Sequence, residues 1–95
     1  RYEVCGDSET AEIAFVIEDG LQGRGVGKIM LYLLARHARF MGISRFVADV
    51  LPENVHMLAM FENCDFPHSM VWSAESVTVT LDVSRDRCSR HLLAR

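Results

Sequence analysis

The chain has 95 residues, of which 49% are hydrophobic and 24% charged, and its formal net charge is −3. This composition is typical of one soluble globular domain. No apolar run approaches the ~18 residues of a membrane span, and Arg1-Tyr2-Glu3 does not begin a signal peptide. We therefore expect a cytoplasmic protein that neither enters nor binds a membrane.

Cysteine and histidine spacing argues against a disulfide framework and against a metal site. Cys5, Cys64 and Cys88 are odd in number and include no C-x-x-C pair, so reduced thiols are expected. The four histidines show no ligand spacing either. We predict no bound metal.

Charge divides the chain into two parts. Residues 1–84 carry six basic and twelve acidic side chains, whereas residues 85–95 carry four arginines and one acid, Asp86. The acidic part argues against a nucleic-acid binder, and a short basic terminus is most commonly solvated. We predict one domain over residues 1–84 and a basic, flexible tail over residues 85–95.

Two short strands are predicted at the start of the chain. Arg1–Cys5 and Ala11–Ile17 are apolar and strand-like, and the turn residues Gly6-Asp7-Ser8 lie between them. This arrangement indicates a hairpin.

An amphipathic helix is predicted over Val26–Met41. Its large apolar residues repeat at intervals of three and four, and Gly42 supplies a C-terminal stop. The expected inner face consists of Val26, Ile29, Met30, Leu33, Leu34, Phe40 and Met41. The expected outer face carries Lys28, Tyr32, Arg36 and Arg39.

A second strand and helix follow. Arg45–Leu51 is rich in strand-forming residues and Pro52 closes it, and Asn54 can then cap a helix that runs to about Asn63. The expected inner residues of this helix are Met57, Leu58 and Phe61.

Two last strands are predicted at Met70–Ser73 and Val77–Val83, about a short turn. A helix between the strands that end at Ile17 and begin at Arg45 fits a right-handed crossover, which joins parallel strands. We therefore expect a mixed sheet in an α/β (α+β) domain with the order β-β-α-β-α-β-β.

Three glycines precede the first helix, in the stretch LQGRGVGKIMLYLL. A Walker-type loop is excluded because Gln22 stands where its first glycine belongs and Ile29 where its Ser/Thr belongs. A G-x-G-x-x-G dinucleotide motif fails at Lys28. The pattern that remains is Gln-x-x-Gly-x-Gly, from Gln22 to Gly27.

Such a glycine loop can bind a pyrophosphate. Gly23, Gly25 and Gly27 leave backbone N–H groups unobstructed, and the helix adds its own unpaired N-terminal donors and the positive end of its dipole. The alternative is a glycine-rich helix start that only packs tightly against the sheet. The spacing favours anion binding.

The segment from Asn54 to Phe66 has the pattern N-x-x-x-x-x-x-F-E-x-x-x-F. Together with the glycine spacing and the order of elements, this segment resembles the GNAT superfamily of acyl-CoA-dependent N-acyltransferases. The wording AEIAFVIEDGLQGRGVG and RFVADVLPEN is most similar to bacterial protein lysine acetyltransferases of the Pat type and to related domains fused to acyl-CoA synthetases. The resemblance covers nearly all of residues 1–84.

The resemblance implies a coenzyme A site formed mostly by main chain. The pyrophosphate would contact the stretch Gln22, Gly23, Arg24, Gly25, Val26, Gly27 and Lys28. The pantetheine arm would pair with the backbone of Phe15, Val16 and Ile17, where an N–H group would also stabilise the reaction's oxyanion. Asn54 would be a further contact, although its capping role alone would explain it.

The resemblance also implies that Glu12 is the general base. A lysine amine with a pKa of ~10.4 is mostly protonated at neutral pH and must lose a proton before it attacks the thioester. The alternative is a solvated glutamate at a sheet edge. Phe61 stands where many members have a proton-donating tyrosine, so the general acid stays unassigned, and Asp65 replaces a frequent glycine.

Length is the largest departure from the family. The family fold usually begins with a strand, two helices and another strand, and this chain starts at about the third strand, without an initiator methionine. We therefore expect a fragment that lacks the N-terminal part of the fold. Three interpretations stay open: an acetyltransferase using acetyl-CoA and a protein lysine, a non-catalytic CoA-binding regulatory module, or a fragment that assembles with its missing half or with itself.

Overall fold

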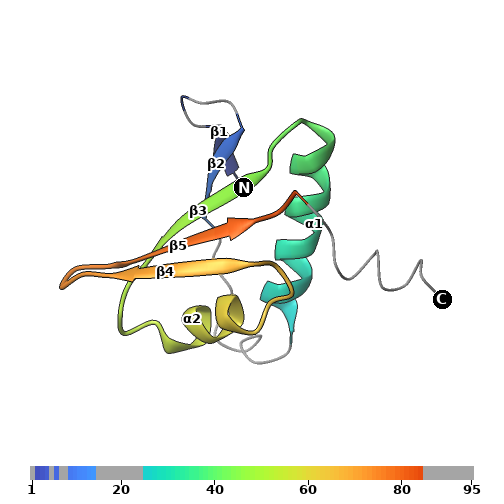
Figure 1. The fold of residues 1–95 in the computed structure, drawn as a ribbon. Helices are drawn as coiled ribbons and strands as arrows, with labels where there is room; N and C mark the ends of the chain where they lie inside the picture. The colour runs from blue at the N-terminus through green and yellow to red at the C-terminus, as the bar shows by residue number, and fades with distance from the viewer. Residues whose placement is uncertain (1, 5, 7–8, 15–24, 85–95) are drawn as a thin grey trace.

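The computed structural model describes residues 2–4, 6, 9–14 and 25–84, which form a mixed sheet flanked by helices (Figure 1). The predicted α/β fold class and the order of elements are confirmed. The strands are β1 (Tyr2–Val4), β2 (Thr10–Ile13), β3 (Arg45–Val50), β4 (His68–Trp72) and β5 (Val77–Asp82), and the helices are α1 (Val26–Phe40) and α2 (Val55–Glu62).

The sheet has the strand order β1-β2-β3-β5-β4. β1 and β2 form the predicted antiparallel hairpin, and β2 runs parallel to β3 with α1 between them in the chain. β5 is antiparallel to both β3 and β4. β1 therefore lies at one edge of the sheet and β4 at the other.

Several strand boundaries differ from the predicted ones, by one residue at the ends of β3 and β5 and by more at β4 and β2. β4 begins at His68, where the apolar pattern predicted Met70, because backbone pairing of His68 with Leu81 does not depend on side-chain polarity. β2 ends at Ile13, and Ala14 lies outside the strand. Residues 15–17, which complete the predicted strand, are outside the described residues.

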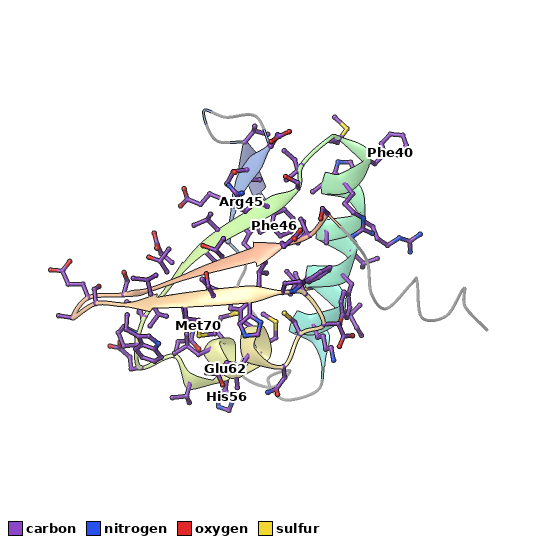
Figure 2. All side chains as sticks on the ribbon, viewed as in Figure 1. Phe40, Arg45, Phe46, His56, Glu62 and Met70 are labelled. Carbon is purple, nitrogen blue, oxygen red and sulfur yellow. The ribbon has the colours of Figure 1, made fainter. Side chains whose placement is uncertain are left out.

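The core lies between one face of the sheet and the two helices. Along β3 and β5 buried and more exposed residues alternate, which is the pattern of a sheet covered on one face. Phe46 on β3 is fully buried and lies between its strand and α1 (Figure 2). From α2, Leu58 and Phe61 are buried and Met57 is half-buried, as predicted.

The buried side of α1 is not the predicted one. Ile29 and Leu33 are each 58% exposed and Phe40 is 88% exposed, and Phe40 extends away from the sheet (Figure 2). The residues that face the core are Gly27, Leu31, Ala35 and Ala38. Small residues let the helix approach the strands closely, and a pattern built on large apolar residues passes over them.

Three further residues at or near α1 also differ from the prediction in their burial. Met41, expected inside, is 61% exposed. Tyr32, expected outside, packs against the core with Leu34. Arg39 is half-buried and donates a hydrogen bond of 3.3 Å to the carbonyl of Val83. Of the predicted outer residues, Arg36 is exposed.

Neither α1 nor α2, the helices of the described part, is long and apolar enough to span a membrane. Cys64 is buried and unpaired.

Candidate functional site

The N-terminal end of α1 is the first part of the candidate site. Gly25 is its N-cap residue, with a left-handed backbone (φ 78°), and its carbonyl accepts a hydrogen bond of 3.0 Å from Ile29 N–H. Among the described residues no side chain caps this end, and its first turn holds no acidic residue. Because a helix offers its own first N–H groups no acceptor, these groups and the positive end of the dipole can bind an anion.

Gly25 and Gly27 differ in what surrounds them. A Cβ at Gly25 would meet no heavy atom within 4 Å among the described residues, so only its φ requires glycine. Gly27 is buried on the side of α1 that faces the sheet, where a missing side chain permits close packing. The packing alternative therefore accounts for Gly27, and the open turn at Gly25 leaves room for a ligand.

Six predicted cofactor residues lie outside the described part of the chain: Phe15, Val16, Ile17, Gln22, Gly23 and Arg24. The register beside them is nevertheless clear. β2 pairs with β3 only as far as Glu12 and Val47, whereas β3 continues to pair with β5 as far as Val50. The described pairing of β2 thus ends first, at the end of the sheet where α1 begins.

The rest of the first turn of α1 consists of Val26, Gly27 and Lys28. Val26 and Lys28 are half-buried, and the Lys28 ammonium lies 6.0 Å from the centre of the Tyr32 ring, one turn further along the helix. This cation therefore lies at the same end of α1 as the first N–H groups, which have no acceptor within the helix.

Asn54 caps α2, as the sequence predicted. Its Oδ1 accepts a hydrogen bond of 3.2 Å from Met57 N–H, and its side chain is exposed. The two helices therefore begin differently, because α2 has a side-chain cap where α1 has none. A contact between Asn54 and a cofactor stays a prediction.

Glu12 lies on the face of the sheet opposite the helices. Its side chain is exposed, and its neighbours in sequence, Ala11 and Ile13, point into the core. In the register it stands beside Val47 of β3, which in turn stands beside Thr80 of β5. We call this side of the sheet the open face.

A second carboxylate on the open face was missed by sequence reasoning. Asp49 lies two residues beyond Val47, is exposed, and accepts a hydrogen bond of 3.0 Å from Thr78 Oγ1. The alternation of β3 places Asp49 on the same side as Glu12. The period-two alternation of β3 is visible in the sequence, but the register that places this strand beside β2 is not.

Phe61 and Asp65, the two departures from the family pattern, have structural partners. Phe61 is only 1% exposed and forms part of the core, so no group at this position reaches solvent. Asp65 accepts a hydrogen bond of 2.7 Å from the hydroxyl of Tyr32. Nothing in the sequence indicated this contact between distant positions.

Comparison with known proteins relates the whole arrangement to one family. The model of the acetyltransferase (GNAT) family matches residues 1–66. The acetyltransferase Pat of Mycolicibacterium smegmatis is 34% identical over 71 residues, which cover 75% of this chain and 20% of that protein.

Solved structures of similar proteins agree with this family assignment. The GNAT domain of S. lividans PAT superposes with a TM-score of 0.74 at 31% identity, covering 85% of this chain and 51% of that one. A Bacillus subtilis acetyltransferase in complex with CoA has the same fold, with a TM-score of 0.66 at 17% identity over 85% of this chain and 65% of that one. This chain therefore spans about a fifth of the Pat protein and about half of the S. lividans domain.

Proposed function

This chain belongs to the acetyltransferase (GNAT) family, and on that premise we propose that residues 1–84 are the cofactor-binding part of an N-acetyltransferase. The donor is acetyl-CoA and the acceptor is an amine, with a protein lysine as the preferred class. Residues 85–95 form a basic tail, and the protein acts in the cytoplasm.

The observation that carries the proposal is the uncapped start of α1. Gly25 turns the chain into the helix without a side chain in the way, and Lys28 adds a cation in the first turn. A pyrophosphate of coenzyme A matches this combination of free N–H donors, helix dipole and positive charge. Gly23 and Arg24 complete the proposed loop, and Phe15 to Ile17 pair with the pantetheine arm.

The open face supplies the acceptor side. Glu12 removes a proton from the lysine ammonium, directly or through one water, and the neutral nitrogen then attacks the thioester carbonyl carbon. The resulting oxyanion collapses and the C–S bond breaks, so coenzyme A leaves as a thiolate. The nitrogen, still cationic after its attack, loses its second proton to become the amide, and the thiolate takes up a proton directly or through water. Glu12 and Asp49 also make this part of the face acidic, which attracts a cationic amine.

The second candidate is a CoA-binding regulatory module that performs no chemistry. It is favoured by one observation, that Phe61, which has no proton to donate and is only 1% exposed, stands where the family resemblance implies a proton-donating tyrosine. The surfaces available for assembly are the outer edge of β1 and the exposed apolar side of α1, which an upstream segment or a second copy would cover.

Two measurements test these proposals in order. Calorimetric titration with coenzyme A should show saturable binding, and a chain that binds no coenzyme A contradicts both candidates. Incubation with acetyl-CoA and a lysine peptide should then release free thiol and add one acetyl group to the peptide by mass. Binding without acetyl transfer, both here and in a longer version of the protein, would leave only the regulatory module.

A further inference from the structure

Tyr32 joins the middle of α1 to the turn that follows α2. Its hydroxyl donates a hydrogen bond of 2.7 Å to Asp65 Oδ2 and accepts one of 3.3 Å from Asp65 N–H. Its ring lies 5.3 Å from the ring of Phe66, centre to centre, at an interplanar angle of 58°. Since Phe66 is 2% exposed, the Tyr32 ring is fixed both by a core side chain and at its hydroxyl.

Lys28 lies one turn before Tyr32, on the same side of α1. Helical side chains lean toward the N-terminus of their helix, so the Tyr32 ring reaches back along the turn from which Lys28 projects. The Lys28 ammonium is 6.0 Å from the ring centre, within the range of a cation–π contact. The ring therefore keeps the ammonium at the start of the helix.

Charges around Cys64 agree with this placement. Burial raises the pKa of the Cys64 thiol, the negative charge of Asp65 raises it further, and the positive charge of Lys28 opposes the shift. The charges of Lys28 and Asp65 thus both act on the same buried thiol. Lys28 is itself half-buried, so its side chain does not extend freely into solvent.

We propose that Tyr32 is a positioning residue for the anion site: held by Asp65 and Phe66, its ring fixes the Lys28 ammonium beside the free N–H groups of α1. The inference rests on the proposed function, because the anion concerned is the pyrophosphate of coenzyme A. Fixing a flexible lysine before binding lowers the conformational entropy that the ligand must remove. The rival explanation is that Tyr32 only docks the turn after α2 onto α1.

A double-mutant cycle separates these explanations. Lys28→Gln should weaken coenzyme A binding about tenfold, the loss of one charge-assisted contact. Tyr32→Leu should weaken it about 2- to 5-fold when Lys28 is present and should have no further effect when Lys28→Gln is already made. Tyr32→Phe, which keeps the ring, should bind more tightly than Tyr32→Leu.

A docking role predicts another pattern, in which Tyr32→Leu weakens binding by the same factor with and without Lys28. That result would overturn the inference while leaving the coenzyme A site intact. Arg36→Gln is the matched charge control, because Arg36 is an exposed cation on the same helix; it should change affinity less than about twofold. An equal loss in Arg36→Gln and Lys28→Gln would show that net charge alone is at work.

Nuclear magnetic resonance gives a readout that needs no cofactor. In the wild type the Lys28 methylene protons should show ring-current shifts, which Tyr32→Leu removes and Tyr32→Phe retains. Random-coil shifts for Lys28 in the wild type would contradict the fixed position. Failure of the wild type to bind coenzyme A would instead overturn the proposed function, so the two failures are distinguishable.

Discussion

The two ends of α1 carry glycines in nearly the same conformation but in different surroundings. Gly25 has φ 78° and Gly42 has φ 87°, and a Cβ at either would meet no described heavy atom within 4 Å. At the C-terminal end the carbonyls are occupied: Met41 N–H bonds to the His37 and Ala38 carbonyls, and Ile43 N–H to that of Ala38. At the N-terminal end no side-chain cap is present in the part of the chain that the structure describes.

This difference shows that a left-handed glycine does not by itself identify a site. At Gly42 the conformation ends the helix, and the backbone of the chain satisfies the exposed carbonyls. At Gly25 the same conformation starts a helix that no side chain of residues 25–84 caps. The absence of a cap, together with Lys28, is what makes the first end a candidate for binding an anion.

The largest expected effect is a loss of turnover on the open face that leaves coenzyme A binding at α1 unchanged. Glu12→Gln keeps size and hydrogen bonding but removes basicity, so turnover of the intact acetyltransferase should fall ~10²–10⁴-fold. Coenzyme A affinity, measured by titration, should hardly change. Raising the pH should partly restore the rate, since solvent then supplies the neutral amine.

Asp49→Asn is the control for Glu12→Gln. It removes the neighbouring carboxylate of the open face and should lower the rate much less, because Asp49 is proposed only to attract the amine. If Glu12→Gln retains full activity at every pH, or Asp49→Asn loses as much, Glu12 is not the base and β2 is only a scaffold for the cofactor.

The next largest effect is expected from replacing the two glycines, Gly25 and Gly42, and comparing the stability and coenzyme A affinity of the two variants. Gly25→Val and Gly42→Val each force a β-branched residue into a left-handed backbone in open space, so both should lose stability by similar amounts, at least ~1–2 kcal/mol in unfolding experiments. Only Gly25→Val should also lose coenzyme A affinity, by more than about tenfold, because its side chain meets the phosphate and tilts the N–H groups. Equal affinity in the two folded variants would remove the anion site from Gly25.

A smaller effect is expected from a charge placed at the N-terminal end of α1, where protein stability and coenzyme A affinity should change in opposite directions. Val26→Asp places a carboxylate in the first turn of α1, which should stabilise the helix dipole by ~0.3–1 kcal/mol relative to Val26→Asn. The same charge should repel pyrophosphate and weaken coenzyme A several-fold relative to the asparagine variant. Thermal melting and titration of this matched pair should therefore shift in opposite directions, and parallel shifts would contradict the anion site.

How much the sequence could predict follows from the range of each interaction. Element order, the glycine start of α1 and the Asn54 cap of α2 depend on local chemistry, and all three are present in the structure. The side of α1 that faces the core depends on how closely the sheet approaches, and the close contacts at Ala35 and Ala38 are not visible in a pattern of large residues.

The parts of the site that the sequence did not predict all depend on contacts between residues far apart in the chain. Asp65 reaches Tyr32 across 33 positions of the chain, and Asp49 joins Glu12 on the open face only through the register of β2 and β3. The contact of Asp65 with Tyr32 has no local signature, because it is decided by which elements the fold brings together. The alternation of β3 places Asp49 on one face of its strand, but only the register shows that this face also carries Glu12. A single sequence can propose such residues only after the topology is known.

The smallest effect on stability concerns the side of α1 between its two ends. Ile29, Leu33 and Phe40 form an exposed apolar stripe, and exposed apolar surface favours self-association or docking of another segment. Phe40→Glu should change the free energy of unfolding by less than ~0.5 kcal/mol, because this side chain is 88% exposed and loses little packing. It should nevertheless shift the sedimentation profile from associated species toward monomer, and Leu33→Glu should act in the same direction. The matched control is Arg36→Gln, which changes the net charge by the same single unit on the exposed side of the helix without removing apolar surface. If the wild-type chain sediments as a stable monomer with a cooperative thermal transition, the stripe needs no cover and the self-association prediction is wrong.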